Sequence, residues 1–274
     1  MVDIDVEEIN KMPEKGVEID LGIVSDAKNF FDSVIVDDSS FEMGPCLYTP
    51  PETTEIWVNK INEWKHKYDE EKMRKGDSAV YDYLDGFFED LPNDCIIVPD
   101  IGGNLVWTMQ CATLRGGQKL FTNFSNASMG CALPIAIGAA IGTGKKVYCI
   151  AGDGGFQMNI QELCTIMEHD TDVKIMILNN GYLGMVRQWQ TLFFDGRYAG
   201  TPMISPNYEF IAKAYSLPYQ KVTELDQVDA AIRTAIDHNG AYILEFVCDP
   251  SEVILPMIPS GGGFGDMIVS RHKS

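Results

Sequence analysis

The sequence predicts an α/β fold: a doubly wound, mainly parallel sheet with helices on both faces, formed by the residues from Cys95 onward. Short apolar runs alternate there with amphipathic stretches, which is typical of parallel strands joined by crossover helices. Two of the runs are followed by loops of turn-forming residues, GDGG and NNGY. No segment recurs with a period of 20–50 residues, which argues against solenoids and propellers.

The region before Cys95 does not follow this alternation. We expect, in order, a strand end at 2–6, a helix at 24–36, an irregular stretch at 41–54, a polar helix at 55–68, a charged linker through Gly76 and a helix at 78–91. The change of pattern predicts two parts, residues 1–76 with the linker and residues 77–274.

Within the second part, four apolar runs predict strands at 95–99, 145–151, 173–178 and 242–247. The amphipathic stretches predict helices at 159–169, 210–215 and 228–238. In the first of these helices, Ile160, Leu163 and Ile166 recur at the spacing of one helix face. The order of strands and helices is therefore that of a doubly wound domain.

Composition excludes several classes of protein. The formal net charge is −19, and 25 of the 40 acidic residues lie in the first 100 positions. Such a charge opposes nucleic acid and anionic membranes. The N-terminus lacks the features of a signal peptide, and no apolar run approaches the 18 or so residues of a membrane span. Seven cysteines without a C-x-x-C pair indicate reduced thiols, so we expect a cytoplasmic protein.

The two turn-rich loops carry the chemistry. Residues 152–155 follow one predicted strand and residues 179–182 follow another, and ligands of open α/β sheets bind beyond such strand ends. Glycine lets backbone N–H groups approach a phosphate closely. Asp153 and Asn180 supply the oxygen atoms that magnesium takes beside phosphate. Each loop alone is better explained as an ordinary turn. Together, each after a buried strand, they favour a site for a diphosphate and a divalent cation.

Gly152-Asp153-Gly154 followed by Asn179-Asn180 resembles the motif of the thiamine-diphosphate-dependent enzymes. The stretches GDGGFQMNIQEL, LNNGYLGMVRQWQ and LPMIPSGGGFGDMI are similar to the catalytic subunit of acetolactate (acetohydroxyacid) synthase. The resemblance covers nearly the whole chain but only the C-terminal half of a family member. It implies a thiamine-diphosphate-binding fold at 77–274, preceded by a remnant of the family's middle domain at 1–76.

The resemblance also implies the site residues. Mg²⁺ would be bound by the side chains of Asp153 and Asn180 and by the main-chain carbonyl of Tyr182. Trp189 would shape the pocket for the second substrate, although taken alone it is equally an aromatic residue of an amphipathic helix. The residues expected to contact thiamine diphosphate are Gly102, Gly103, Asn104, Met129, Gly152, Asp153, Gly154, Gly155, Asn180, Tyr182, Leu183, Gly184 and Met185.

Met129 matches the residue that holds the cofactor in its bent shape, although methionine also fills core gaps. Gly102-Gly103-Asn104 stands where the family usually has Gly-Gln-His, so we expect backbone rather than side-chain contacts there. Residues 123–129 also depart from the family's glycine-rich sequence, which leaves the identity of the substrate open.

The function that the resemblance implies is decarboxylation of pyruvate and condensation with a second 2-keto acid, as in branched-chain amino-acid biosynthesis. The glutamate that activates the cofactor belongs to the family's pyrimidine-binding domain, so no catalytic residue is assigned in this chain. We expect another chain to supply that domain in a homo- or hetero-oligomer, with little activity without it, and we expect no FAD site from this chain alone. The alternatives are a non-catalytic subunit that binds thiamine diphosphate or serves assembly, and a related decarboxylase or carboligase for another keto acid.

Overall fold

The computed structural model describes residues 1–34, 52–67, 78–259, 261–263 and 266–269. Contacts divide the chain into two compact units, Met1–Trp64 and Lys65–Ser274. The boundary predicted between residues 76 and 77 lies outside the described residues, as do the charged linker and most of the irregular stretch at 41–54. In the described part of the chain, no helix is long and apolar enough to span a bilayer.

The first unit contains a parallel pair of two-residue strands, β1 and β2. Its elements are β1 (Val2–Asp3), α1 (Val6–Asn10), η1 (Pro13–Lys15), β2 (Ile23–Val24), α2 (Ala27–Val34) and most of α3 (Glu52–Lys67), whose last three residues lie beyond the unit boundary. The strand predicted at 2–6 ends early because the Asp5 carboxylate caps α1, accepting the Glu7 N–H at 2.9 Å. The helix predicted from Val24 begins at Ala27 for the same reason, since Asp26 accepts the Lys28 N–H at 2.9 Å.

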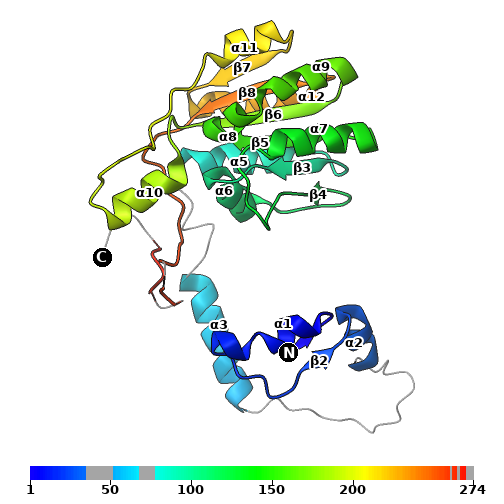
Figure 1. The fold of residues 1–274 in the computed structure, drawn as a ribbon, viewed down its shortest axis with the longest axis vertical. Helices are drawn as coiled ribbons and strands as arrows, with labels where there is room; N and C mark the ends of the chain where they lie inside the picture. The colour runs from blue at the N-terminus through cyan, green and yellow to red at the C-terminus, as the bar shows by residue number, and fades with distance from the viewer. Residues whose placement is uncertain (35–51, 68–77, 260, 264–265, 270–274) are drawn as a thin grey trace. The chain divides into compact units, whose positions relative to one another are not determined.

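The predicted α/β fold is confirmed in the second unit, where a six-stranded sheet is parallel throughout (Figure 1). The strand order across the sheet is β4-β3-β5-β6-β8-β7. The strands are β3 (Ile96–Pro99), β4 (Lys119–Leu120), β5 (Val147–Gly152), β6 (Val173–Asn179), β7 (Tyr219–Val222) and β8 (Tyr242–Val247). Four of them were predicted within two residues, because each is an apolar run buried on both faces.

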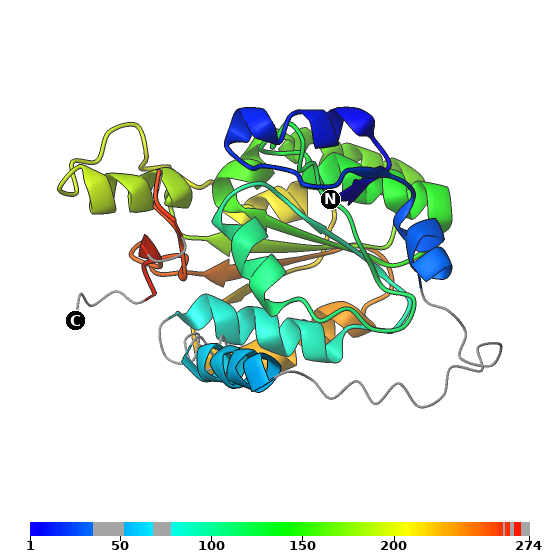
Figure 2. The ribbon, with the colours of Figure 1, turned by 90° about the horizontal axis from the view of Figure 1, so that it is seen from below.

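Helices cover both faces of the sheet, and each layer has its own apolar core (Figure 2). One face packs against α5 (Ala79–Asp90), α6 (Gly103–Cys111) and α12 (Val228–Asp237). The other packs against α7 (Ala132–Thr143), α8 (Asp153–Met158), α9 (Leu163–His169) and α11 (Tyr208–Ala214). Alternate residues of a strand serve the two cores, so that Tyr148 faces the first and Cys149 the second.

Several elements differ from the sequence prediction. The helix predicted at 159–169 is interrupted by a 3-10 turn, η2 (Ile160–Glu162), before α9 begins. A separate helix, α10 (Gly184–Phe193), follows β6. The helices α6 and α7 and the edge strands β4 and β7 were not predicted.

The register of the two central strands determines where their loops meet. β5 and β6 pair in parallel with Ala151 opposite Ile177 and Gly152 opposite Leu178. The chain leaves both strands at the same edge of the sheet, because parallel strands share one carboxyl end. The start of α8 at Asp153 and the loop that follows Asn179 are therefore neighbours.

Candidate functional site

A pocket of about 100 Å³ opens at the carboxyl ends of β3, β5 and β6. Its lining includes all thirteen residues that the sequence analysis assigned to cofactor contact. Seven further residues line it, namely Ile101, Trp107, Leu178, Val186, Gln188, Glu252 and Ile254. The structure thus brings together segments that lie more than 150 positions apart in the sequence.

Asp153 places a carboxylate at the base of this pocket. The residue is 2% exposed, and its Oδ2 accepts a hydrogen bond from the Ser205 hydroxyl at 3.0 Å. Burial raises the pKa of this carboxyl group, against the opposing effects of Ser205 and of the backbone N–H groups of Gly154 and Gly181. No basic side chain forms an ion pair with it among the described residues.

The loop beside Asp153 is held by its own side chains and by a neighbouring segment. Asn180 Oδ1 accepts the Tyr182 N–H at 3.0 Å, which closes an Asx turn. The N–H of Leu183 donates to the Thr201 carbonyl at 2.9 Å, and that of Met203 donates to the Gly181 carbonyl at 2.8 Å. The backbone around Tyr182 is therefore fixed on both sides.

Glycines form the wall of the pocket because there is no room for larger residues. A Cβ atom on Gly154 would lie 2.8 Å from the Met203 sulfur, and one on Gly184 would lie 2.9 Å from Asn180 Nδ2. A Cβ atom on Gly155 would overlap the carboxylate of Asp100. Packing within the protein therefore favours glycine at these positions, and all three glycines line the pocket.

The loop after β3 presents backbone rather than long side chains. Gly102 has a φ of 135°, which an L-residue rarely adopts, and directly precedes α6. The Asn104 amide is buried and donates to the carbonyls of Asp100 and Ile150 at 2.7 and 3.2 Å. The Asn104 Nδ2 atom is therefore hydrogen-bonded to the protein backbone.

Asp100 positions the segment that carries Met129. It is fully buried at the end of β3, and its two carboxylate oxygens accept the N–H groups of Gly130 at 3.0 Å and Ala132 at 3.2 Å. Gly130 adopts a φ of 82°, and Asn159 donates to its carbonyl at 2.7 Å. Asp100 was not predicted from the sequence, although an acidic residue directly after an apolar strand was a signal for it.

We expect Asp100→Asn to lower the free energy of unfolding by about 2–3 kcal/mol, since the amide nitrogen would face a backbone N–H and leave that donor unpaired. Thermal unfolding of the two proteins measures the difference. Asp94→Asn is a suitable control because Asp94 is exposed and contacts Lys145 at the surface. Equal unfolding midpoints for Asp100→Asn and the unchanged protein would contradict this role.

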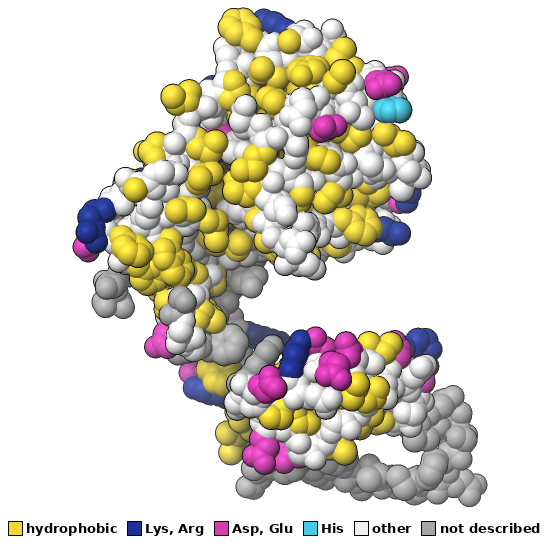
Figure 3. Space-filling model, viewed as in Figure 1, with side chains coloured by type: hydrophobic (Ala, Val, Ile, Leu, Met, Phe, Trp, Pro, Cys, Tyr) yellow, Lys and Arg dark blue, Asp and Glu magenta, His cyan; other side chains and the backbone are white. Residues whose placement is uncertain are grey.

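The helix α10 has a broad apolar surface. Figure 3 shows hydrophobic side chains gathered over it. Those at least one-third exposed are Met185, Val186, Trp189, Leu192 and Phe193. Trp189 packs on Phe193 with a centroid distance of 4.5 Å and does not line the pocket, so its predicted contact with substrate stays a prediction.

Gln188 and Glu252 connect the pocket to the C-terminal segment. The Gln188 side chain donates to the Ile254 carbonyl at 3.0 Å and accepts the Ile254 N–H at 2.7 Å. Glu252 accepts the Ala79 N–H at 3.1 Å. Neither was assigned from the sequence, because each reaches the site through contacts with distant residues.

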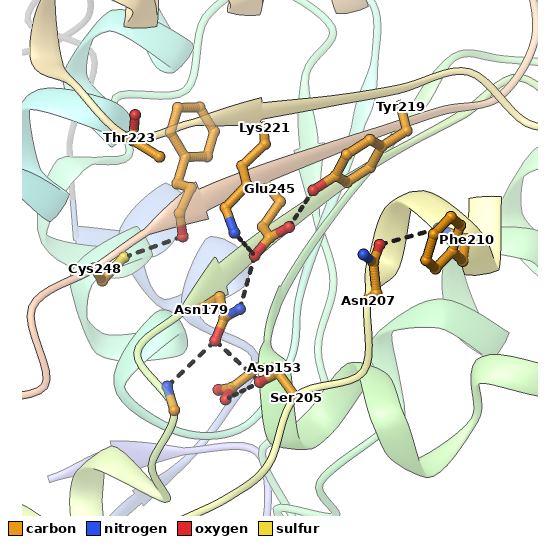
Figure 4. Close-up of polar contacts among 12 residues, drawn as sticks. Asp153, Asn179, Ser205, Asn207, Phe210, Tyr219, Lys221, Thr223, Glu245 and Cys248 are labelled. Carbon is orange, nitrogen blue, oxygen red and sulfur yellow. Dashed lines mark hydrogen bonds and ion pairs between the residues drawn. The ribbon is translucent and has the colours of Figure 1, made fainter. Parts of the chain in front are cut away.

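A hydrogen-bonded series of side chains lies behind Asp153 (Figure 4). Ser205 also lies 3.1 Å from Asn179 Oδ1, and Asn179 Nδ2 donates to Glu245 at 2.7 Å. Glu245 is 2% exposed on β8 and is bonded by Tyr219. Sequence analysis missed this series, and its one signal was a glutamate inside the apolar run of β8.

The residues of the pocket fit a divalent cation and a diphosphate. A buried carboxylate without a basic partner, next to amide and carbonyl oxygens, has the hard donor atoms that Mg²⁺ prefers. In the described residues no three His, Cys, Asp or Glu side chains form a metal cluster. A cation here would therefore take most of its ligands from neutral oxygens and from the bound anion.

Comparisons with known proteins agree with this geometry. Residues 100–246 match the family described as thiamine pyrophosphate enzyme, C-terminal TPP binding domain. The chain is 37% identical over 179 residues to acetolactate synthase isozyme 2 large subunit of Escherichia coli, covering 65% of this chain and 33% of that protein. It is 38% identical over 222 residues to acetolactate synthase 1, chloroplastic, of Nicotiana tabacum, covering 77% and 33%. With the corresponding protein of Zea mays it is 31% identical over 280 residues, covering 98% and 42%. The chain thus spans between a third and about two fifths of the length of these relatives.

Proposed function

The chain belongs to the thiamine pyrophosphate enzymes, and on that premise we propose that it is the diphosphate- and Mg²⁺-binding part of a carboligase of the acetolactate synthase type. Its substrates would be pyruvate and a second 2-keto acid, as in branched-chain amino-acid biosynthesis. The observation that carries the proposal is the buried Asp153 carboxylate in a glycine-walled pocket, beside the loop of Asn180 and Tyr182.

The charge of the pocket supports a metal ion. The charged side chains that line it in the described residues are Asp153 and Glu252, and both are acidic. A diphosphate carries several negative charges, so it would be repelled here unless a divalent cation lay between the anions. Asp153, Asn180 and the Tyr182 carbonyl would hold that ion.

The chain's own residues would bind and orient the cofactor. The backbone of Gly102, Gly154 and Gly155 offers close approach to the diphosphate, and Met129, held by the Asp100 contacts, would support the bent conformation. Bound thiamine diphosphate supplies the nucleophilic carbon that attacks a 2-keto acid. The apolar side chains of Leu183 and Met185 line the same pocket and would contact the bound cofactor.

We also propose a partner surface for the other end of the cofactor. Glu252, the glutamate that lines the pocket in the described part of the chain, already accepts the Ala79 N–H, so the activating carboxylate is expected from a pyrimidine-binding domain. The exposed apolar surface of α10 supports such docking, because patches of this kind commonly mark interfaces.

Buried free thiols such as Cys95 and Cys149 support a reducing compartment, and we propose that the protein is cytoplasmic.

Titration calorimetry with thiamine diphosphate tests the proposal. We expect binding in the presence of Mg²⁺ and a loss of affinity of about tenfold or more when the metal is removed with EDTA. Binding that is equally tight with EDTA would contradict the metal-dependent site.

An activity assay tests the need for a partner. The chain is incubated with pyruvate, thiamine diphosphate and Mg²⁺, alone and with the product of a neighbouring reading frame that carries a pyrimidine-binding domain. We expect acetolactate only from the mixture. Acetolactate formed by the chain alone would contradict the partner proposal, whereas binding without turnover in either case would favour the non-catalytic alternative.

A further inference from the structure

We infer that Ser205, Asn179 and Glu245 form a positioning array, a set of side chains that holds Asp153 and the adjoining 179–182 loop in the geometry a divalent cation needs. The inference rests on the proposed function. It assigns roles to three residues that do not line the pocket. None of them would touch the cation, so their effect would be transmitted through Asp153 and the loop.

Ser205 is the link to the proposed metal ligand. Its hydroxyl lies 3.0 Å from Asp153 Oδ2 and 3.1 Å from Asn179 Oδ1, and both of these atoms are acceptors. The hydroxyl has one hydrogen, so the two oxygens share it in a three-centre bond that links Asn179 to Asp153. The Asp153 carboxylate is the stronger acceptor of this hydrogen, because its hydrogen bond is charge-assisted and because Asn179 Oδ1 already accepts the Gly181 N–H at 3.2 Å.

Asn179 is held at both ends of its amide. Its oxygen faces Ser205 and Gly181, and its nitrogen donates to Glu245 Oε1 at 2.7 Å. Rotation of the amide by half a turn would place its nitrogen against the Gly181 N–H and its oxygen against the Glu245 carboxylate. The orientation is therefore fixed, and with it the start of the 179–182 loop.

Glu245 is the anchor of the array. Burial of a carboxylate in the sheet is unfavourable unless the carboxylate is well paired. Here it is bonded by Asn179 and by the Tyr219 hydroxyl, and the half-exposed Lys221 ammonium lies 3.5 Å away. Figure 4 shows the contacts running from β7 through β8 to Asn179 on β6, and from there through Ser205 to Asp153 at the start of α8. The rigid sheet thus supports the ligand, as outer-shell partners do in metal sites.

The test measures metal binding directly with the 274-residue chain, using electron paramagnetic resonance of Mn²⁺ in the presence of thiamine diphosphate. We expect Ser205→Ala to raise the Mn²⁺ dissociation constant by about tenfold or more, the usual effect of losing an outer-shell partner. Ser205→Thr keeps the hydroxyl and should retain most of the affinity. Ser33→Ala is the matched control, since it removes an exposed hydroxyl that donates to the Phe30 carbonyl in the other unit.

A double-variant comparison distinguishes an array from separate contacts. Asn179→Ala alone should weaken Mn²⁺ binding, and adding Ser205→Ala should weaken it little further, because both changes break the same series of bonds. Thermal unfolding of each variant is measured in parallel without metal. Additive losses of affinity, or a lower unfolding midpoint with unchanged affinity, would overturn the positioning role.

The outcomes separate the inference from the proposed function. If the Ser205→Ala protein binds Mn²⁺ as tightly as the unchanged protein does, the positioning array is wrong. The proposed cofactor site is not contradicted by that result. Unchanged protein that takes up neither Mn²⁺ nor thiamine diphosphate overturns the proposed function and the array together.

Discussion

Replacement of Asp153 by Asn is expected to reduce Mg²⁺-dependent binding of thiamine diphosphate by about 100-fold or more, equivalent to about 2.7 kcal/mol. Asp153 is the single carboxylate of the proposed ligand set, and a neutral amide cannot offset the charge of a divalent cation. The substitution preserves the volume of the side chain, so the effect would be that of charge. Titration calorimetry with and without Mg²⁺ measures it.

The same variant should be about as stable as the unchanged protein when no metal is present, because the loss of a buried charge offsets the weaker contacts with Ser205 and the neighbouring N–H groups. Asp153 is buried without a basic partner among the described residues, and burial raises its pKa, which means that the folded protein disfavours the charged form. Asn removes that charge. Loss of binding together with retained or improved stability would distinguish a metal-ligand role from a structural one.

Asp170→Asn is the control for charge alone. Asp170 is exposed beyond the end of α9, and its φ of 46° is one that asparagine also tolerates. We expect unchanged affinity for thiamine diphosphate. An Asp153→Asn protein that still binds the cofactor with Mg²⁺-dependent affinity would contradict the proposed site.

The sequence predicted the central strands well and the small or non-periodic elements poorly. β5, β6 and β8 are apolar runs, so their pattern identifies them. By contrast, α7 (ALPIAIGAAIGT) consists almost entirely of small and apolar residues, so it shows no alternation of polar and apolar faces. The edge strand β7 reads YQKV and is only partly buried, which makes it resemble a loop.

The residues of the pocket were assigned by resemblance, whereas their supports required the fold. Glu245 lies 66 positions from Asn179 and Ser205 lies 52 from Asp153. No local pattern in the sequence indicates that such distant residues are in contact. The strand order β5-β6-β8 brings them together. A similar limit applies to Trp189, whose helical position was visible in the sequence but whose exposed orientation depends on how α10 packs.

Gly155→Ala is expected to be the most destabilising single substitution in the pocket, lowering the free energy of unfolding by roughly 3 kcal/mol or more. The added Cβ atom would overlap Asp100 Oδ2. Asp100 cannot move away cheaply, because it is fully buried and its oxygens accept the N–H groups of Gly130 and Ala132. Either those bonds break or the glycine wall shifts, and both outcomes would disturb Met129.

Thermal unfolding with Gly138→Ala as the matched control tests this expectation. Gly138 lies in α7 and has open space where an added Cβ atom would lie, so alanine there should stabilise the helix by about 0.5–1 kcal/mol. The two glycine-to-alanine changes are thus expected to have opposite signs. Adding Asp100→Ala to Gly155→Ala should cost less than Asp100→Ala costs alone, because the single variant has already displaced the carboxylate. Equal stability of Gly155→Ala and the unchanged protein would contradict the rigid contact between the end of β3 and the first turn of α8, on which the shape of the cofactor pocket depends.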